Sequence, residues 1–164
     1  MRIDSIVSLP PISHIGVVVR DLDRSMAIYS STFGAGPWRV AELTYPDVVI
    51  KGEHKSYQVR LAFAEWDSME LELIQPVSGD SLYSDFLNER GEGMHHLGYL
   101  VNQEEKAEIT TRLAKVGIRP LQESNSSMHS GSFAYFDADK TGGVIIELIH
   151  RPAGFQLSDL PGKS

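Results

Sequence analysis

The chain has 164 residues, with 15 Lys and Arg against 22 Asp and Glu, which gives a formal net charge of −7. A chain of this length forms one domain or two small modules that share a core. With 41% hydrophobic and 23% charged residues, the composition is that of a globular protein and argues against disorder, collagen and coiled coil. An acidic chain is a poor candidate for binding nucleic acid or an anionic membrane, because both partners need a basic surface.

The absence of certain residue types and segments from the sequence excludes further classes of protein. The chain contains no cysteine, which excludes disulfides, thiolate catalysis and zinc or iron–sulfur sites held by cysteine. The first residues, MRIDSIVSLPP, include an early acid and lack the apolar stretch of a secretory signal. No run approaches the roughly 18 apolar residues of a membrane span. We therefore expect a soluble cytoplasmic protein without nucleic-acid or membrane partners.

Two pairs of segments far apart in the chain read alike. Residues 14–19 (HIGVVV) and 96–101 (HLGYLV) each begin with His, an aliphatic residue and Gly, and then continue apolar. Residues 71–76 (LELIQP) and 146–151 (IELIHR) share the run Glu-Leu-Ile. The sequence therefore predicts an internal repeat, in which each half opens and closes with a strand. The first half is longer, and we assign its additional residues to a loop around 46–55.

A helical pattern follows each opening strand. In the first half, apolar residues recur every three or four positions over residues 22–33, behind the candidate N-cap Asp21. In the second half, Asn102 and Glu105 form a candidate capping pair, and Gly117 is the expected stop.

Between its helix and its closing strand, each half has room for two more strands. We place these four strands at residues 38–45, 57–64, 118–122 and 132–136. Each half is then β-α-β-β-β, and the fold class is α+β, with two modules forming a mixed-sheet, half-barrel cleft. The expected boundaries are a first module at 11–78, a linker with a short helix at 79–93, and a second module at 94–151.

Four side chains at matching positions of the repeat are of types that bind metal ions: His14, Glu72, His96 and Glu147. Glu147 lies in a nearly continuous apolar strand, where a buried carboxylate must be paired, protonated or bound to a cation. A Gly two residues after each His leaves space beside the imidazole for a ligand or metal. Two imidazoles and two carboxylates suit one divalent Zn, Ni, Co, Mn or Fe ion. His95 is expected on the opposite face of its strand, in a structural role.

A metal ion at this point would polarise a carbonyl and stabilise the enolate that forms when the neighbouring carbon loses a proton. Glu147 is the candidate catalytic base as well as a ligand, and no second base is evident. Arg60, among apolar residues, and His129, in the polar loop 124–131, are candidates for binding the substrate. For both residues, a side chain that simply faces solvent is the competing interpretation.

The sequence resembles the vicinal oxygen chelate superfamily over residues 11–151. The resemblance is carried by ISHIGVVVRDLDRSMAIYSSTFG, MELELIQP, GEGMHHLGYLV and GGVIIELI. Among members it is most similar to methylmalonyl-CoA epimerase, whereas Glu at position 72 is closer to glyoxalase I. The resemblance implies paired β-α-β-β-β modules and metal ligands at the four repeat positions.

The leading hypothesis is a metal-dependent isomerase or epimerase that deprotonates a carbon next to a carbonyl or thioester through a metal-chelated enolate. A glyoxalase I-like lyase would use the same enolate. Two further hypotheses are an Fe(II) dioxygenase with the triad His14, His96 and Glu147, and a metal-free small-molecule binding or resistance protein. Open sheet edges would favour a homodimer, with the cleft formed within one chain or between two.

Overall fold

The computed structural model describes residues 5–124, 131–136, 139, 141–156 and 159. These residues form, in chain order, β1 (His14–Val18), α1 (Leu22–Phe33), β2 (Arg39–Ile50), β3 (Glu53–Trp66), β4 (Met69–Gly79), α2 (Leu82–Arg90), β5 (Gly93–Leu100), α3 (Gln103–Lys115), β6 (Pro120–Ser124), β7 (Ser132–Phe136) and β8 (Ile145–His150). The order is β-α-β-β-β on each side of α2, which confirms the predicted α+β class. No helix in this part of the chain has the length and apolar character needed to cross a membrane.

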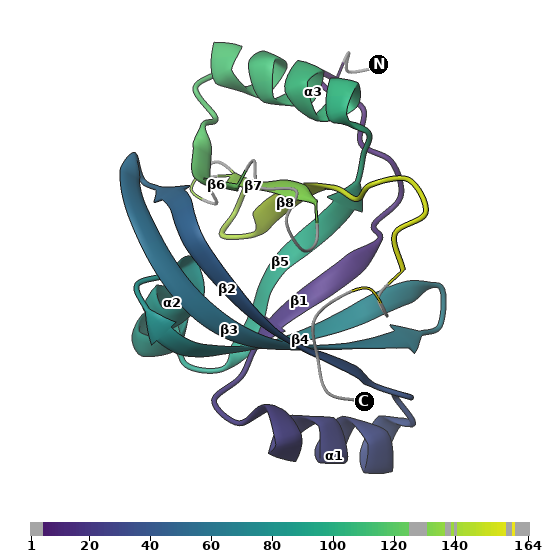
Figure 1. The fold of residues 1–164 in the computed structure, drawn as a ribbon. Helices are drawn as coiled ribbons and strands as arrows, with labels where there is room; N and C mark the ends of the chain where they lie inside the picture. Colours follow the sequence, from purple (N-terminus) through teal and green to yellow (C-terminus); the bar gives the residue numbers. More distant parts are fainter. Residues whose placement is uncertain (1–4, 125–130, 137–138, 140, 157–158, 160–164) are drawn as a thin grey trace.

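The eight strands close into one barrel (Figure 1), in the order β1-β4-β3-β2-β6-β7-β8-β5. The two halves meet twice. The opening strands β1 and β5 pair antiparallel, and the end of β2 pairs with β6 through Val49 opposite Glu123 and Ile50 opposite Gln122. Among the described residues the β2–β6 contact is limited to these two pairs, so the barrel closes only at the end of β2.

The predicted loop at 46–55 is wrong. β2 and β3 form one long hairpin whose turn is Lys51 and Gly52, both with positive φ. Their ladder shifts register between Tyr45 and Val48, which accommodates Pro46, a residue that cannot donate to a regular ladder. The additional residues thus lengthen β2 until it reaches β6, and they close the barrel.

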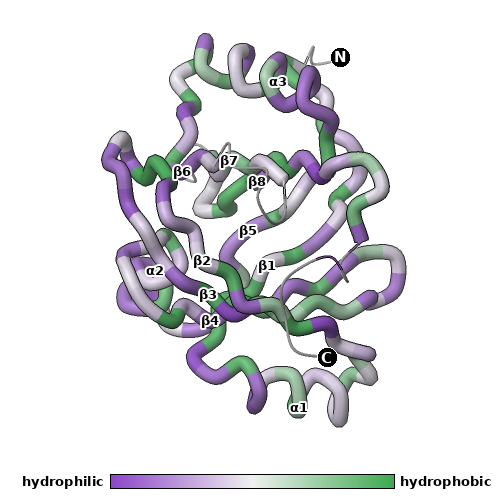
Figure 2. The backbone as a smooth tube through the Cα atoms, in the orientation of Figure 1, coloured by the Kyte–Doolittle hydropathy of each residue, from purple (hydrophilic) through white to green (hydrophobic). Residues whose placement is uncertain are grey.

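Apolar side chains gather in three clusters. One fills the barrel interior and is rich in aromatic rings, including Tyr57, Tyr83 and Tyr135. The other two lie outside the barrel, one involving Leu22 of α1 and one involving Ile109 of α3. In Figure 1 these two helices lie at opposite ends of the view, and in Figure 2 green and purple stretches alternate along the chain. Strands with apolar residues on both faces therefore pack against the interior cluster on one face and against a helix on the other.

The capping pair predicted for the second helix is confirmed. The Asn102 side chain accepts a hydrogen bond from the Glu105 N–H at 2.8 Å, and the Glu105 carboxylate accepts one from the Asn102 N–H at 2.8 Å. We expect Asn102→Ala to lower the free energy of unfolding by about 1 kcal/mol, because the first turn loses its acceptor. Urea denaturation would measure this. Glu104→Ala, in the same turn but outside the capping box, is the control, and an equal loss in both variants would contradict the expectation.

Candidate metal centre

The opening strands place each histidine opposite a glycine of the other half. In the antiparallel β1–β5 pair, His14 faces Gly98, and Gly16 faces His96. A Cβ atom on Gly98 would lie 1.9 Å from Cε1 of His14, and one on Gly16 would lie 2.0 Å from Cε1 of His96. Each glycine therefore makes room for the imidazole of the opposite module, and not for the histidine of its own strand.

The closing strands bring the carboxylates to the same place. β4 runs parallel to β1 with Glu72 opposite Gly16, and β8 runs parallel to β5 with Glu147 opposite Gly98. Because a glycine separates each glutamate from a histidine in the same cross-strand row, no side chain stands between them. All four residues belong to one chain, so this cluster forms without a second copy.

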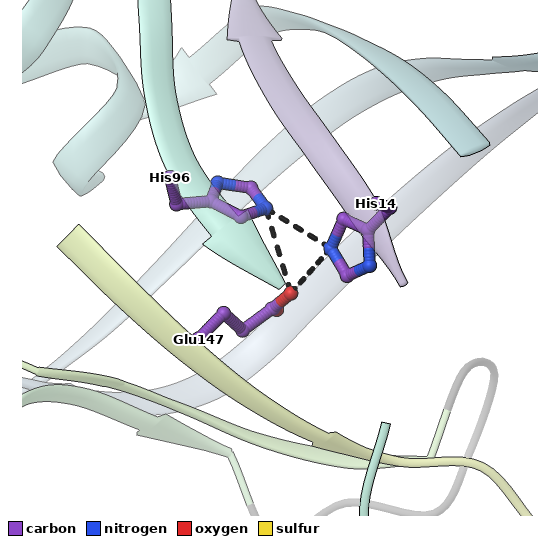
Figure 3. A group of neighbouring side chains, drawn as sticks. All are labelled: His14, His96 and Glu147. Atoms are coloured by element: carbon purple, nitrogen blue, oxygen red, sulfur yellow. Dashed lines mark hydrogen bonds and ion pairs between the residues drawn. The ribbon is translucent and has the colours of Figure 1, made fainter. Parts of the chain in front are cut away.

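Three of these side chains point toward one another (Figure 3). His14 Nε2 lies 2.7 Å from Glu147 Oε2 and 3.2 Å from His96 Nε2, and His96 Nε2 lies 3.4 Å from Glu147 Oε2. Glu72 completes the group, with Oε2 at 3.4 Å from His96 Nε2 and 3.7 Å from His14 Nε2. All four side chains are buried.

The cluster fits a divalent metal ion. Two nitrogen or oxygen ligands about 2.0–2.1 Å from one ion lie roughly 3.0–3.4 Å apart, close to the separations seen here. Burial lowers the pKa of His96, but Glu147 and Glu72 outweigh burial and raise it to about 9. Burial raises the pKa of Glu147, but His96 and His14 outweigh it and hold that pKa well below its usual value. The site thus favours a positive charge between its carboxylates, as a bound cation supplies.

Both imidazoles are oriented through Nδ1 by the preceding residue. The Ser13 hydroxyl donates to the Gly98 carbonyl at 3.0 Å, so it can accept from Nδ1–H of His14, also at 3.0 Å. Nδ1 of His96 lies 3.0 Å from Nδ1 of His95. An imidazole that donates from Nδ1 leaves the Nε2 lone pair for a metal ion.

The prediction that His95 lies on the opposite face of its strand from His96 is wrong. The β1–β5 register shifts at this point, since Gly16 faces His96 while Val17 faces Met94, so His95 is an extra residue in a β-bulge. A bulge redirects side chains, and His95 lies buried with its ring against His96 and Tyr83. Simple alternation along the strand carries no signal for such a bulge.

We expect His95→Phe to weaken metal binding about 10–100-fold, because His96 Nδ1–H loses its acceptor while the aromatic ring is kept. Competition with a chelator would measure the affinity, and circular dichroism would verify the fold. His54→Phe, on an exposed imidazole paired with Asp47, is the control. Unchanged affinity in His95→Phe would show that His95 does not orient the ligand.

Three members of the cluster, His14, Glu72 and Glu147, line a small cavity of about 30 Å³ with aromatic walls. Two of its tyrosines, Tyr83 and Tyr135, share a hydrogen bond of 2.7 Å between their hydroxyls. Burial raises the pKa of both hydroxyls well above the usual value, so both remain neutral donors. The sequence does not single them out, because a tyrosine in an apolar strand is also typical of a structural core.

Of the two candidate substrate-binding residues, Arg60 does not lie at this cavity. Arg60 lies on the outer face of β3, where it forms ion pairs with Asp23 of α1 and Glu42 of β2. Val59 and Leu61 on either side of it face the cavity, so strand alternation directs Arg60 outward. His129 lies outside the described residues. The arginine at the cavity is Arg151, which no sequence pattern marks as functional.

A model of the glyoxalase/bleomycin resistance protein/dioxygenase superfamily matches residues 13–136. The chain belongs to this superfamily. The match runs from the residue before His14 to the end of β7, ahead of β8, and confirms the resemblance seen in the sequence. This member of the superfamily thus has a buried cluster of two histidines and a glutamate that could hold a divalent ion.

The superfamily relatives of this chain include epimerases. Mouse mitochondrial methylmalonyl-CoA epimerase is 30% identical over 139 residues, covering 84% of this chain and 71% of that protein. YqjC of Bacillus subtilis, an uncharacterized protein, is 26% identical over 151 residues, covering 90% of this chain and 96% of that protein.

Solved epimerase structures share the fold. A methylmalonyl-CoA epimerase in complex with methylmalonyl-CoA and NH4+ superposes with a TM-score of 0.64 at 22% identity, covering 89% of this chain and 97% of that chain. The epimerase from Mycobacterium tuberculosis gives a TM-score of 0.59 at 22% identity and covers 93% of both chains.

Proposed function

We propose that this protein is a metal-dependent epimerase or isomerase that removes a proton from a carbon next to a thioester or carbonyl. The observation that carries the proposal is the convergence of four repeat-related side chains, His14, Glu72, His96 and Glu147, in one buried cluster. The similarity to methylmalonyl-CoA epimerases supports a thioester substrate.

In this proposal the two histidines and two glutamates hold one divalent Zn, Ni, Co, Mn or Fe ion. Such an ion, when bound, acts as a Lewis acid on the carbonyl oxygen of the substrate. Glu147 accepts the proton from the neighbouring carbon, and delivery of a proton to the other face of that carbon, or to the next carbon, completes the epimerisation or isomerisation. Tyr83 and Tyr135 line the same cavity, and whichever hydroxyl accepts in their mutual hydrogen bond keeps its own proton to donate to the negative charge that develops on the substrate.

Glyoxalase I-like lyase chemistry is the second candidate. Glu72 supports it, because its carboxylate reaches both imidazoles and makes the cluster a four-residue set. Both reactions begin with removal of a proton from carbon, so the residue roles are the same and only the product differs.

Elemental analysis and proton exchange would test the proposal together. We expect about one divalent ion per chain in the purified protein, loss of that ion in His96→Ala, and retention in His54→Ala. In D₂O, methylmalonyl-CoA should take up deuterium at its 2-carbon, whereas conversion of a hemithioacetal to a thioester would identify a lyase. If the protein takes up none of Zn, Co, Ni, Mn or Fe(II), the enolate mechanism is excluded and a metal-free binding protein is favoured. Oxygen consumption with a catechol would instead identify a dioxygenase.

A further inference from the structure

The cavity beside the metal-ligand cluster is too small for a substrate. Its free volume is about 30 Å³, which is room for roughly one or two water molecules. Ligand pockets in proteins span roughly 300–1,000 Å³, and even a short acyl group needs more space than this cavity offers. Part of the cavity wall must therefore move before a thioester or carbonyl compound can reach the cluster.

Most of this wall belongs to regular elements. The described lining residues lie on β1, β2, β3, β4, α2, β7 and β8, with two exceptions, Arg151 and Phe155. A strand of the barrel cannot move away without breaking ladder hydrogen bonds to its neighbours. Residues 151–156, the C-terminal strap, leave the barrel wall at the end of β8 (Figure 1) and lie outside every described helix and strand. The strap is therefore the part of the wall that can move while the barrel stays folded.

A few contacts hold the strap in place. Nη2 of Arg151 donates to Oε1 of Glu70 on β4 at 2.9 Å, and these side chains are 22% and 14% exposed. The same guanidinium lies 5.4 Å from the centre of the Phe155 ring, at cation–π distance. The Phe155 N–H donates to the Pro152 carbonyl at 3.0 Å, across a turn in which Gly154 has a φ of 79°. The strap thus folds back on itself and is tied to β4 by one ion pair.

Phe155 is the part of the strap that enters the barrel. Its ring packs against the aromatic cluster of the barrel interior and forms part of the cavity wall. Pro152, Ala153, Gly154 and Gln156, its neighbours in the strap, are exposed. Opening the strap therefore breaks the ion pair and uncovers one partly buried ring. Such local openings need much less free energy than unfolding of the whole domain.

We propose that the C-terminal strap is a gate: Phe155 fills space that the substrate takes, and Arg151 latches the strap to Glu70 until the substrate enters. A closed strap also keeps solvent away from the metal-ligand cluster. The proposal rests on the proposed function only in taking this cavity as the place where the substrate binds. The opening itself requires neither a metal ion nor a reaction.

Thiol labelling would measure the opening, because the chain contains no cysteine. Val59 lines the cavity and is 2% exposed, so Val59→Cys places a small, buried thiol in the wall. We expect slow labelling of this thiol by N-ethylmaleimide, followed by mass spectrometry. Adding Phe155→Ala should speed labelling at least about ten-fold, because the closed strap loses the burial of its ring. Adding Arg112→Gln, on an exposed α3 side chain paired with Glu108, is the control and should leave the rate unchanged.

The latch has its own test on the Val59→Cys background. Arg151→Gln and Glu70→Gln should each speed labelling roughly two- to five-fold, the range for loss of one ion pair near the surface. The two changes together should add little to either one, because both remove the same contact. A separate thiol from Val19→Cys reports general loosening, since Val19 is 4% exposed and packs in the cluster outside the barrel that involves α1. Its labelling should not respond to Phe155→Ala.

Three results would overturn the inference. They are fast labelling of Val59→Cys without further changes, an equal rate with and without Phe155→Ala, or an acceleration that is as large at Val19→Cys. Failure of the proposed function has a different signature: no divalent ion would be retained and no thioester or carbonyl compound would exchange its proton, while labelling of Val59→Cys would still respond to Phe155→Ala. Proton exchange combined with labelling that ignores Phe155→Ala would retain the reaction and reject the gate.

Discussion

Gly98→Ala is expected to abolish metal binding while the barrel still folds. The new Cβ would lie 1.9 Å from Cε1 of His14, so the imidazole must leave its position. Gly98 lies in regular β5 strand and its φ is not positive, so the backbone itself tolerates alanine. Metal content by elemental analysis would fall from about one ion per chain to near zero, with an unchanged circular dichroism spectrum.

The pseudosymmetry of the two halves supplies a second test of the same arrangement. Gly16→Ala should give the same loss, because its Cβ would lie 2.0 Å from Cε1 of His96. Gly142→Ala is the control: nothing lies within 4 Å of the added Cβ, although its φ of 72° makes alanine somewhat strained. Full metal content in Gly98→Ala would show that His14 does not occupy the position opposite Gly98 in the metal-bound protein.

Glu147→Gln is expected to reduce proton exchange from the substrate about 10²–10⁴-fold, the range for loss of a positioned general base. Glutamine keeps the shape of the side chain but cannot accept the proton from carbon. Exchange of deuterium into methylmalonyl-CoA, followed by mass spectrometry, would measure the effect. Metal content measured on the same preparation separates loss of the base from loss of the ligand.

Glu72→Gln is the matched comparison for Glu147→Gln, because both carboxylates contact both imidazoles. Glu147 makes the shorter contacts, at 2.7 and 3.4 Å against 3.4 and 3.7 Å for Glu72. We therefore expect the smaller effect from Glu72→Gln. A larger loss of exchange in Glu72→Gln, with metal retained, would assign the role of base to Glu72 and contradict the role proposed for Glu147.

Local pattern predicted much of this molecule. The N-cap role of Asp21 is confirmed by its hydrogen bond from Arg24 N–H, and strand β7 lies at the predicted residues 132–136. Such features depend on residues within a few positions of one another, so a single sequence reveals them. The repeat also indicated which residues meet, since equivalent strands of two like modules pair in equivalent ways.

Features that depend on register between distant strands could not be predicted. His95 forms a bulge at the point where the pairing of β1 with β5 shifts by one residue after Gly16. The sequence of β5 alone does not indicate this shift. The outward position of Arg60 and the inward position of Arg151 follow from which face of each strand the barrel encloses. A shift of one residue in the register of a strand moves all of its side chains to the opposite face of the sheet.

The sequence by itself determined the α+β modules, their caps and the four residues His14, Glu72, His96 and Glu147, because each was marked by local pattern and by its counterpart in the repeat. Only the tertiary structure decided that the halves close into one barrel, that each glycine serves the histidine of the other half, and that Arg151 reaches the cavity. The physical reason is that pairing between strands far apart in the chain sets these contacts, through register and side-chain volume.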